Sequence, residues 1–175
     1  MSFLRNICAS KILPDVIQIQ HSQFDDLRGS LWTTFDKDIF SNFKVYGSLN
    51  FAHDKFATSK KDVLRGIHGD HKSYKLITVV FGTVFQVVVD CREDSDDYLK
   101  HQTFQLDANQ PTSILLPPGF GNAFCSLSDT TVYHYKLAYT GSYVDAGEQF
   151  TYKWNDPRIA VKWPVANPIL SSRDK

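Results

Sequence analysis

The sequence predicts an all-β protein, and three observations support that prediction. Aromatic residues, which are enriched in strands, make up 14% of the 175 residues. Short apolar runs recur along the chain with a period of two and end at glycine or proline. A helical period of 3.6 is sustained nowhere, and only residues 36–43 are expected to form two helical turns. Many short strands joined by such turns are typical of a sandwich or a barrel, and a small barrel wide enough for a ligand is the expected fold.

The first half of the chain carries four expected strands. Residues 16–20 and 30–35 are strands separated by a polar segment, HSQFDDLRG. Residues 74–90 contain two β-rich runs that meet at Gly82-Thr83, where we expect a tight turn. Both alternating faces of the second run are apolar, which predicts a strand that is covered on both sides.

The second half continues the pattern. Residues 113–116 form a short strand that ends at Pro117-Pro118-Gly119, because proline cannot continue a ladder. Residues 131–140 form a strand in which Tyr133 and Tyr135 share one face, while His134 and Lys136 point the other way. Residues 91–101 are expected to be a charged loop leading into a strand, and the tail 163–175 to be irregular with one helical turn. Because there is no repeat or break in composition, we expect one domain over residues 1–175.

Composition excludes several classes of protein. The 19 basic and 19 acidic residues leave no net charge, so we expect no nucleic-acid partner. No apolar run approaches the roughly 20 residues that cross a bilayer, and the N-terminus has no apolar region typical of a secretory signal. The three cysteines are odd in number and lack C-x-x-C spacing, which favours free thiols in a reducing compartment. The expected protein is soluble and cytoplasmic.

Common catalytic motifs are missing from the sequence. It contains no G-x-G-x-x-G, no P-loop, no G-x-S-x-G and no H-E-x-x-H. A nucleotide cofactor and a simple serine hydrolase are therefore unsupported.

His68 is the first candidate for chemistry. On an alternating strand, Gly66 and His68 would face one side, and Arg65 and Ile67 the other. Gly66 would let a ligand approach the backbone closely, although a hydrogen-bonded structural histidine is the alternative. His71 makes a metal pair conceivable, but zinc or iron needs further converging ligands, so we expect no metal.

Three further residues are candidates, and two of them have two interpretations each. Tyr135 either packs in the core or acts as a general acid beside an enolate. Lys75 either extends its ammonium to solvent or stabilises negative charge on a carbonyl oxygen. Asp174, second from the end, has the composition of a disordered tail. Spacing alone does not link these residues to His68.

Seven segments together resemble the dTDP-4-dehydrorhamnose 3,5-epimerase family of RmlC-like cupins. They occur in the family's order and span nearly the whole chain: DLRG (26–29), SKKDVLRGIH (59–68), KLITVVFGTVFQVVVDCREDS (75–95), ILLPPGFGNAF (114–124), YHYK (133–136), WNDPRIAVKWP (154–164) and LSSRD (170–174). Segments such as HDKF (53–56) and GIHGD (66–70) are similar to a narrower branch that acts on GDP-linked 4-keto-6-deoxy-heptoses in bacterial capsule synthesis. The resemblance implies an all-β cupin or jelly-roll barrel with a few short helices. It also implies a homodimer that exchanges N-terminal strands, and no cofactor.

The resemblance assigns roles by position. His68 matches the family's base, and Asp174 matches the aspartate that pairs with it. Tyr135 matches the acid. Lys75 matches a lysine near the C4 oxygen of the sugar.

Binding residues follow in the same way. Arg28 and Arg65 match arginines that hold the nucleotide diphosphate, whose oxygens suit the guanidinium fork. Asn122 stands where the family has a histidine, and His53 and Lys55 stand in place of the family's Q-D-N. Because these positions contact nucleotide or sugar, the departures favour a GDP-linked heptose over dTDP-4-keto-6-deoxyglucose.

The implied reaction is an epimerisation through an enolate. A C4 ketone makes the hydrogens at C3 and C5 acidic, so a base and an acid on opposite faces invert the carbon between them. Whether C5 is inverted as well as C3 is left open. The alternatives are the dTDP-sugar 3,5-epimerase, a non-catalytic nucleotide-sugar-binding cupin, a ketoisomerase on the same scaffold and a metal-dependent cupin dioxygenase.

Overall fold

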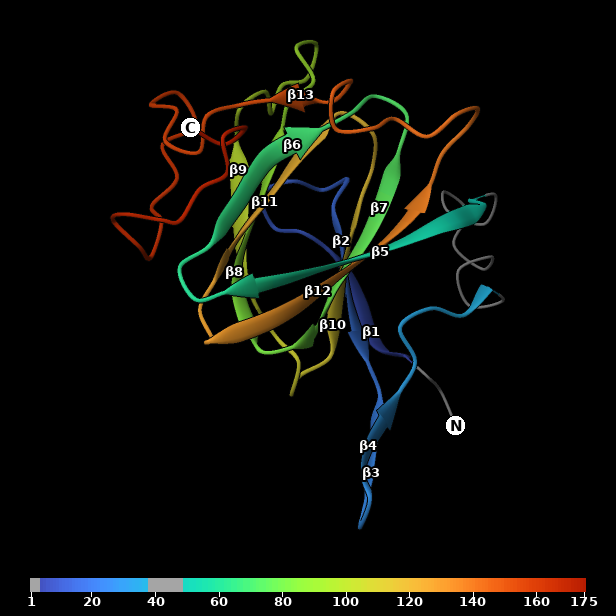
Figure 1. The fold of residues 1–175 in the computed structure, drawn as a ribbon. Coiled ribbons are helices and arrows are strands. Elements are labelled where there is room, and N and C mark those ends of the chain that lie inside the picture. The colour runs from blue at the N-terminus through green and yellow to red at the C-terminus, as the bar shows by residue number, and fades with distance from the viewer. Residues whose placement is uncertain (1–3, 38–48) are drawn as a thin grey trace.

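The computed structural model describes residues 4–37 and 49–175, in which thirteen β-strands form two facing sheets and a separate hairpin (Figure 1). The six-stranded sheet has the order β1 (Leu4–Ala9), β2 (Ile17–His21), β10 (Thr112–Leu116), β7 (Tyr74–Phe81), β12 (Thr130–Ala138) and β5 (Phe51–Lys60). The five-stranded sheet has the order β13 (Phe150–Thr151), β6 (Leu64–Gly69), β11 (Phe120–Ser126), β8 (Thr83–Asp90) and β9 (His101–Asp107). The hairpin pairs β3 (Gln23–Asp26) with β4 (Gly29–Trp32). Within the described residues the expected barrel is thus a pair of packed sheets, not one closed ladder.

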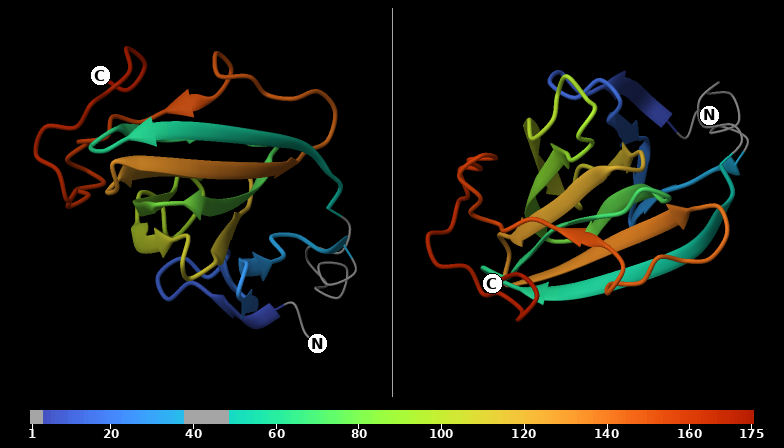
Figure 2. Two further views of the ribbon diagram at one scale, coloured as in Figure 1. Left: turned by 60° about the horizontal axis from the view of Figure 1, so that its bottom comes forward. Right: turned by 90° about the horizontal axis from the view of Figure 1, so that it is seen from above.

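Strand β8 is covered on both faces, which confirms the prediction from its sequence. Val84 and Val88 belong to the core between the two sheets. Val87 and Val89 belong to a second cluster on the other side of β8, which Ile159 of the C-terminal segment helps to form. The C-terminal segment passes along this outer side of the five-stranded sheet (Figure 2). Burial on both faces makes β8 a rigid centre for the sheet that carries much of the site.

Most of the predicted strands are present. The runs in residues 74–90 are β7 and β8, and they meet at Gly82, whose φ of 77° suits a tight turn without a Cβ. Strands β2, β10 and β12 lie close to their predicted bounds. The predicted helix over 36–43 falls largely outside the described residues. The tail ends in a turn over 172–174 instead of a helical turn.

Two of the strands that the sequence did not reveal are polar. Strand β5 carries His53, Asp54 and Lys55 in succession, so its pattern lacks the apolar alternation that identifies a strand. It forms because its backbone pairs along almost its whole length with β12. The segment HSQFDDLRG was predicted only to separate two strands, but it contains β3 and the turn of a hairpin.

The hairpin β3–β4 projects away from the two sheets (Figure 1). Arg28 lies in its turn and pairs with Asp26, with a closest N···O distance of 2.5 Å. Leu27 is fully exposed, and Leu31 is largely exposed. A projecting element with bare leucine side chains is typical of a contact surface.

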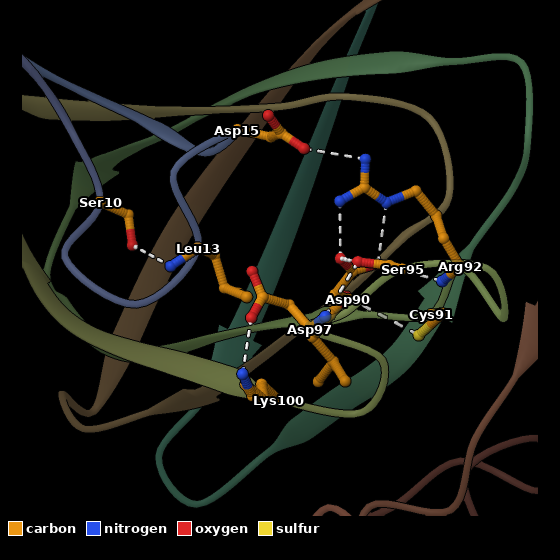
Figure 3. A network of polar contacts seen from close by, with 10 residues as sticks. Ser10, Leu13, Asp15, Asp90, Cys91, Arg92, Ser95, Asp97 and Lys100 are labelled. Carbon is orange, nitrogen blue, oxygen red and sulfur yellow. Dashed lines mark hydrogen bonds and ion pairs between the residues drawn. The ribbon is translucent and has the colours of Figure 1, made fainter.

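A polar network joins the end of β8 to the connection between β1 and β2 (Figure 3). Arg92 donates to both carboxylate oxygens of Asp90, at 2.9 and 2.6 Å, and its third nitrogen lies 2.8 Å from Asp15 Oδ2. Ser95 Oγ donates to Asp90 at 2.7 Å. Burial alone would raise the pKa of Asp90, but the bonds from Arg92 and Ser95 outweigh it and lower that pKa below its usual value. Asp90 is therefore a buried, ionised anchor for the 91–100 loop.

No helix among residues 4–37 and 49–175 is long and apolar enough to span a membrane.

We predict that Asp90→Asn lowers the free energy of unfolding at pH 7 by about 2 kcal/mol, because a buried charged acceptor is lost. The pKa of Asp90 is lower in the folded protein, so its stabilisation is present above the unfolded value of about 3.9 and is lost as the pH falls through the folded value. The difference between wild type and variant should therefore shrink below about pH 4. Urea denaturation of both proteins at pH 7 and at several lower pH values measures this difference in the free energy of unfolding. The exposed Asp129→Asn is the matched control, with an expected change within about 0.5 kcal/mol. A difference between Asp90→Asn and wild type that does not depend on pH would contradict the prediction.

Candidate active site

One cavity of about 340 Å³ collects most of the residues singled out in the sequence. It is lined by side chains from β5, β6, β7, β11 and β12 together with the end of the chain. The predicted residues among its lining are Lys55, Arg65, His68, Lys75, Asn122, Tyr135 and Asp174. The structure thus brings together, from five strands and the tail, residues that spacing left unlinked.

A bulge in β6 turns two of these side chains to the same side. Arg65 is paired with Phe124 of β11 and His68 with Asn122, so β6 has one more residue than β11 over this stretch. The extra residue breaks the alternation of side chains, and both Arg65 and His68 line the cavity. Ile67 packs instead in the cluster outside the sheet. The prediction that Arg65 and His68 face opposite sides is therefore wrong.

The C-terminal tail brings Asp174 to His68. The tail returns to the start of β6, where Leu64 N donates to Ile169 O at 3.0 Å. A turn then follows, in which Ser171 Oγ donates to Asp174 Oδ2 at 2.6 Å. Asp174 Oδ1 lies 2.7 Å from His68 Nε2, and Asp174 is only 4% exposed. The composition of a disordered tail was thus a misleading signal for Asp174.

Asp174 is held in its ionised form. Burial by itself would raise the pKa of this carboxyl group, but its contacts with His68 and Ser171 and the Gly66 amide lower the pKa below its usual value. A fixed carboxylate at this distance from Nε2 can orient the imidazole ring of His68. His68 and Asp174 therefore form a unit suited to taking a proton from a ligand in the cavity.

Lys75 is a buried ammonium on the inner face of β7. Its Nζ lies 3.5 Å from Asp70 Oδ2, and Asp70 Oδ1 accepts hydrogen bonds from the amides of Lys72 and Ser73. Burial lowers the pKa of Lys75, and the Asp70 charge opposes that shift. A poorly solvated cation at the cavity wall is suited to stabilising negative charge on a ligand oxygen.

Tyr135 enters the cavity from β12, on the face predicted from the sequence. Its ring packs against the main core and lies 4.7 Å from that of Tyr133. Burial raises the pKa of Tyr135, although Arg65 acts in the opposite direction. The hydroxyl therefore stays protonated and can serve as a proton donor. His134 points to the opposite side of β12, where its Nε2 lies 2.7 Å from Asp54.

Basic side chains dominate the cavity lining. Arg65, Lys55 and Arg173 line it, and among the lining residues Asp174 carries the one carboxylate. Two lining residues were not predicted from the sequence: Arg173, which is adjacent to Asp174 in the LSSRD segment, and Tyr143, which contacts Lys55. For Arg173 that adjacency was an available signal, whereas Tyr143 lies in a segment without a motif. This charge distribution suits an anionic ligand such as a diphosphate.

Two predicted binding residues do not line the cavity. His53 lies behind Tyr143, with the two ring centres 4.6 Å apart. Arg28 lies on the projecting hairpin.

His71 packs its ring against Phe150 at 5.2 Å, and no three His, Cys, Asp or Glu side chains gather as metal ligands in the described part of the chain. All three cysteines are free thiols, as predicted.

Comparison with known proteins gives a consistent result. The family model for dTDP-4-dehydrorhamnose 3,5-epimerase matches residues 10–175. The chain belongs to the dTDP-4-dehydrorhamnose 3,5-epimerase family. It is 34% identical to the dTDP-4-dehydrorhamnose 3,5-epimerase of Shigella flexneri over 165 residues, which cover 93% of this chain and 89% of the relative. It is 32% identical to the dTDP-4-dehydrorhamnose 3-epimerase of Streptomyces niveus, covering 91% of this chain and 77% of the relative.

A solved structure of the same family shares the fold. The dTDP-6-deoxy-D-glucose-3,5-epimerase of Legionella pneumophila, in complex with dTDP-4-keto-L-rhamnose, superposes with a TM-score of 0.88. The match has 28% identity and covers 97% of this chain and 89% of that one. The predicted all-β cupin fold and the assignment to a family of epimerases, which are isomerases, are confirmed. The few short helices expected with the fold are not found as complete elements within the described residues, where the regular elements are strands. These relatives are named for dTDP sugars, so they do not confirm the expected proximity to GDP-heptose enzymes.

The bulge in β6 depends on Gly66. Its φ is 125°, and a Cβ built there would lie 2.3 Å from Ala123 Cβ and 2.6 Å from Asn122 O. We predict that Gly66→Ala lowers the free energy of unfolding by about 3 kcal/mol, because strand and side chain would both have to shift. Chemical denaturation measures the change. The control is Gly147→Ala, since Gly147 has nothing within 4 Å of a built Cβ. Equal stability of the two variants would show that β6 accommodates a side chain at residue 66.

Proposed function

We propose that this protein is a nucleotide-sugar epimerase that inverts C3, and also C5, of a 4-keto-6-deoxy sugar by proton transfer. The observation that carries the proposal is the convergence of a histidine–carboxylate unit, a protonated tyrosine and a buried lysine on one cavity. His68 Nε2 lies 2.7 Å from Asp174, and Lys75 and Tyr135 line the same space. These groups supply a base, an acid and a site for developing negative charge.

The proposed chemistry follows from the ketone at C4. His68 removes the proton from C3, and the electrons move onto the C4 oxygen to form an enolate. Lys75 stabilises that oxygen. Tyr135 then donates a proton to C3 from the opposite face, which inverts the centre. The same groups repeat the step at C5 after the sugar ring is reoriented, and Asp174 holds His68 in place throughout.

The proposed substrate is dTDP-4-keto-6-deoxyglucose. It is the alternative left open by the sequence, and the names of the relatives favour it over a GDP-linked heptose. The GDP-linked 4-keto-6-deoxy-heptose of capsule synthesis is the second candidate, because Asn122 and Lys55 line the cavity where the family pattern has other residues. The proposed location is the cytoplasm.

We also propose that the active unit is a homodimer in which strands near the N-terminus are exchanged. Arg28 lies outside the cavity of its own chain, on a hairpin that projects from the sheets and exposes Leu27 and Leu31. A second copy related by a two-fold axis would cover these leucines and bring its Arg28 to the diphosphate in the neighbouring site.

The first prediction is an exchange experiment in D₂O monitored by proton NMR. Wild-type protein should introduce deuterium at both C3 and C5. His68→Asn should slow exchange by roughly 10²- to 10⁴-fold, because the base is lost. Tyr135→Phe should lose inversion while exchange at C3 continues, because His68 can still remove and return a proton on one face.

Both substrates are tested with the same proteins. The exposed Gln105→Met of β9 is the control and should match the wild type. Exchange with the GDP-heptose but not with the dTDP-hexose would reverse the order of the two candidate substrates. If wild-type protein exchanges no deuterium into either substrate, the non-catalytic nucleotide-sugar-binding cupin is favoured. A 3-keto product would indicate a ketoisomerase.

A second prediction concerns the partner subunit. Arg28→Ala and His68→Asn should each be weakly active alone. Unfolding and refolding them together should restore about a quarter of wild-type activity, because half of the mixed dimers are heterodimers with one intact site each. Light scattering checks the dimer, and Arg28→Ala refolded alone is the control. A stable monomer, or a mixture no more active than its components, would show that Arg28 does not act in a neighbouring site.

A further inference from the structure

A backbone carbonyl sets the orientation of Gln86, a buried side chain that contacts Asn122 of the cavity wall. Gln86 lies in β8 and is completely buried. Its Nε2 donates to Val87 O at 2.9 Å. A backbone carbonyl can only accept, so the amide nitrogen of Gln86, and not its oxygen, must face Val87.

The orientation of Gln86 in turn determines the orientation of the Asn122 amide on the neighbouring strand β11. The same Gln86 Nε2 lies 2.7 Å from Asn122 Oδ1 and donates its second hydrogen to it. Gln86 Oε1 accepts from the hydroxyl of Tyr133 at 2.6 Å, so the remaining side of the Gln86 amide is also satisfied. Tyr133 is fully buried, and its hydroxyl also lies within 3.3 Å of Asn122 Oδ1. The amide of Gln86 cannot reverse without breaking all of these bonds.

With its oxygen engaged in this way, Asn122 has only its amide NH2 group available to a ligand in the cavity. Asn122 is 6% exposed and lines the same space as His68, Lys75 and Tyr135. Its oxygen is directed toward Gln86 and Tyr133. Its amide nitrogen therefore faces the cavity.

We propose that Gln86 is a positioning residue that fixes Asn122 as a hydrogen-bond donor to the substrate. The proposal rests on the proposed epimerase function. It deepens that function by adding a second fixed donor beside Lys75 for the oxygen that gains charge in the enolate. An amide can donate a hydrogen bond but does not act as a general acid or base at neutral pH. Asn122 therefore stabilises the intermediate, and it leaves proton transfer to His68 and Tyr135.

The test is a double-mutant cycle between residues 86 and 122, measured by deuterium exchange at C3 and steady-state kinetics. Asn122→Leu should lower kcat by about 100-fold, as loss of an oxyanion donor does. Gln86→Met keeps the volume but makes no hydrogen bond, and it should lower kcat by about 10- to 100-fold with little change in KM. In the Asn122→Leu background, Gln86→Met should change kcat by less than about twofold, because its effect acts through Asn122.

Two further variants make the test robust to misfolding. Asn122→Asp has nearly the same shape and still accepts from Gln86, but it presents an oxygen to the cavity, so it should lose at least about 100-fold in kcat. Gln105→Met is the matched control for Gln86→Met and should keep wild-type kinetics. Thermal denaturation checks that each variant is folded.

The outcomes separate the two proposals. If wild-type protein exchanges C3 and Gln86→Met retains full kcat, or loses activity equally in both backgrounds, the role of Gln86 is overturned while the epimerase function stands. A fully active Asn122→Asp would likewise remove the donor role. If wild-type protein exchanges neither substrate, the proposed function and this inference fall together.

Discussion

The site depends on the extra residue that β6 carries relative to β11. A strand in regular pairing places neighbouring side chains on opposite faces, so Arg65 and His68 could not both reach the cavity from a regular β6. The bulge allows it, with residues 65–68 of β6 opposite residues 122–124 of β11. Gly66 permits the close approach of the two strands, and its amide donates to Asp174 at 3.4 Å. The same distortion thus places the histidine and provides part of the binding site for the carboxylate.

The charges of the cavity are held in place by burial and by a small number of partners. Asp174 stays ionised because of the groups around it, and Lys75 is retained in a poorly solvated position by Asp70. Charged groups fixed in this way need no reorganisation when a ligand gains charge, which is the basis of electrostatic catalysis. Keeping charged groups in poorly solvated positions costs stability, because burial removes them from water.

The scaffold beneath these groups is rigid because β8 is buried on both faces. Its inward valines pack between the sheets, and its outward valines pack beneath the C-terminal segment. Gln86 sits among them as a buried polar residue with every hydrogen bond made inside the protein. A polar group at the centre of such a strand is tolerated only when it is fully satisfied, and its partners here lead directly to Asn122 in the cavity wall.

The sequence by itself determined the strands with strong apolar patterns and the family resemblance. β7, β8 and β12 were predictable because a period of two expresses burial directly, and the same period placed Tyr135 on the core face and His134 away from it. Only the tertiary structure decided which side Arg65 faces, because a bulge is a property of two paired strands and leaves no periodic signal. For Asp174, the family resemblance implied the pairing with His68, whereas local composition indicated a disordered tail. The tertiary structure shows that its burial comes from contacts between a polar tail and β6, a strand about a hundred residues earlier in the chain. Long-range pairing of this kind cannot be read from local composition.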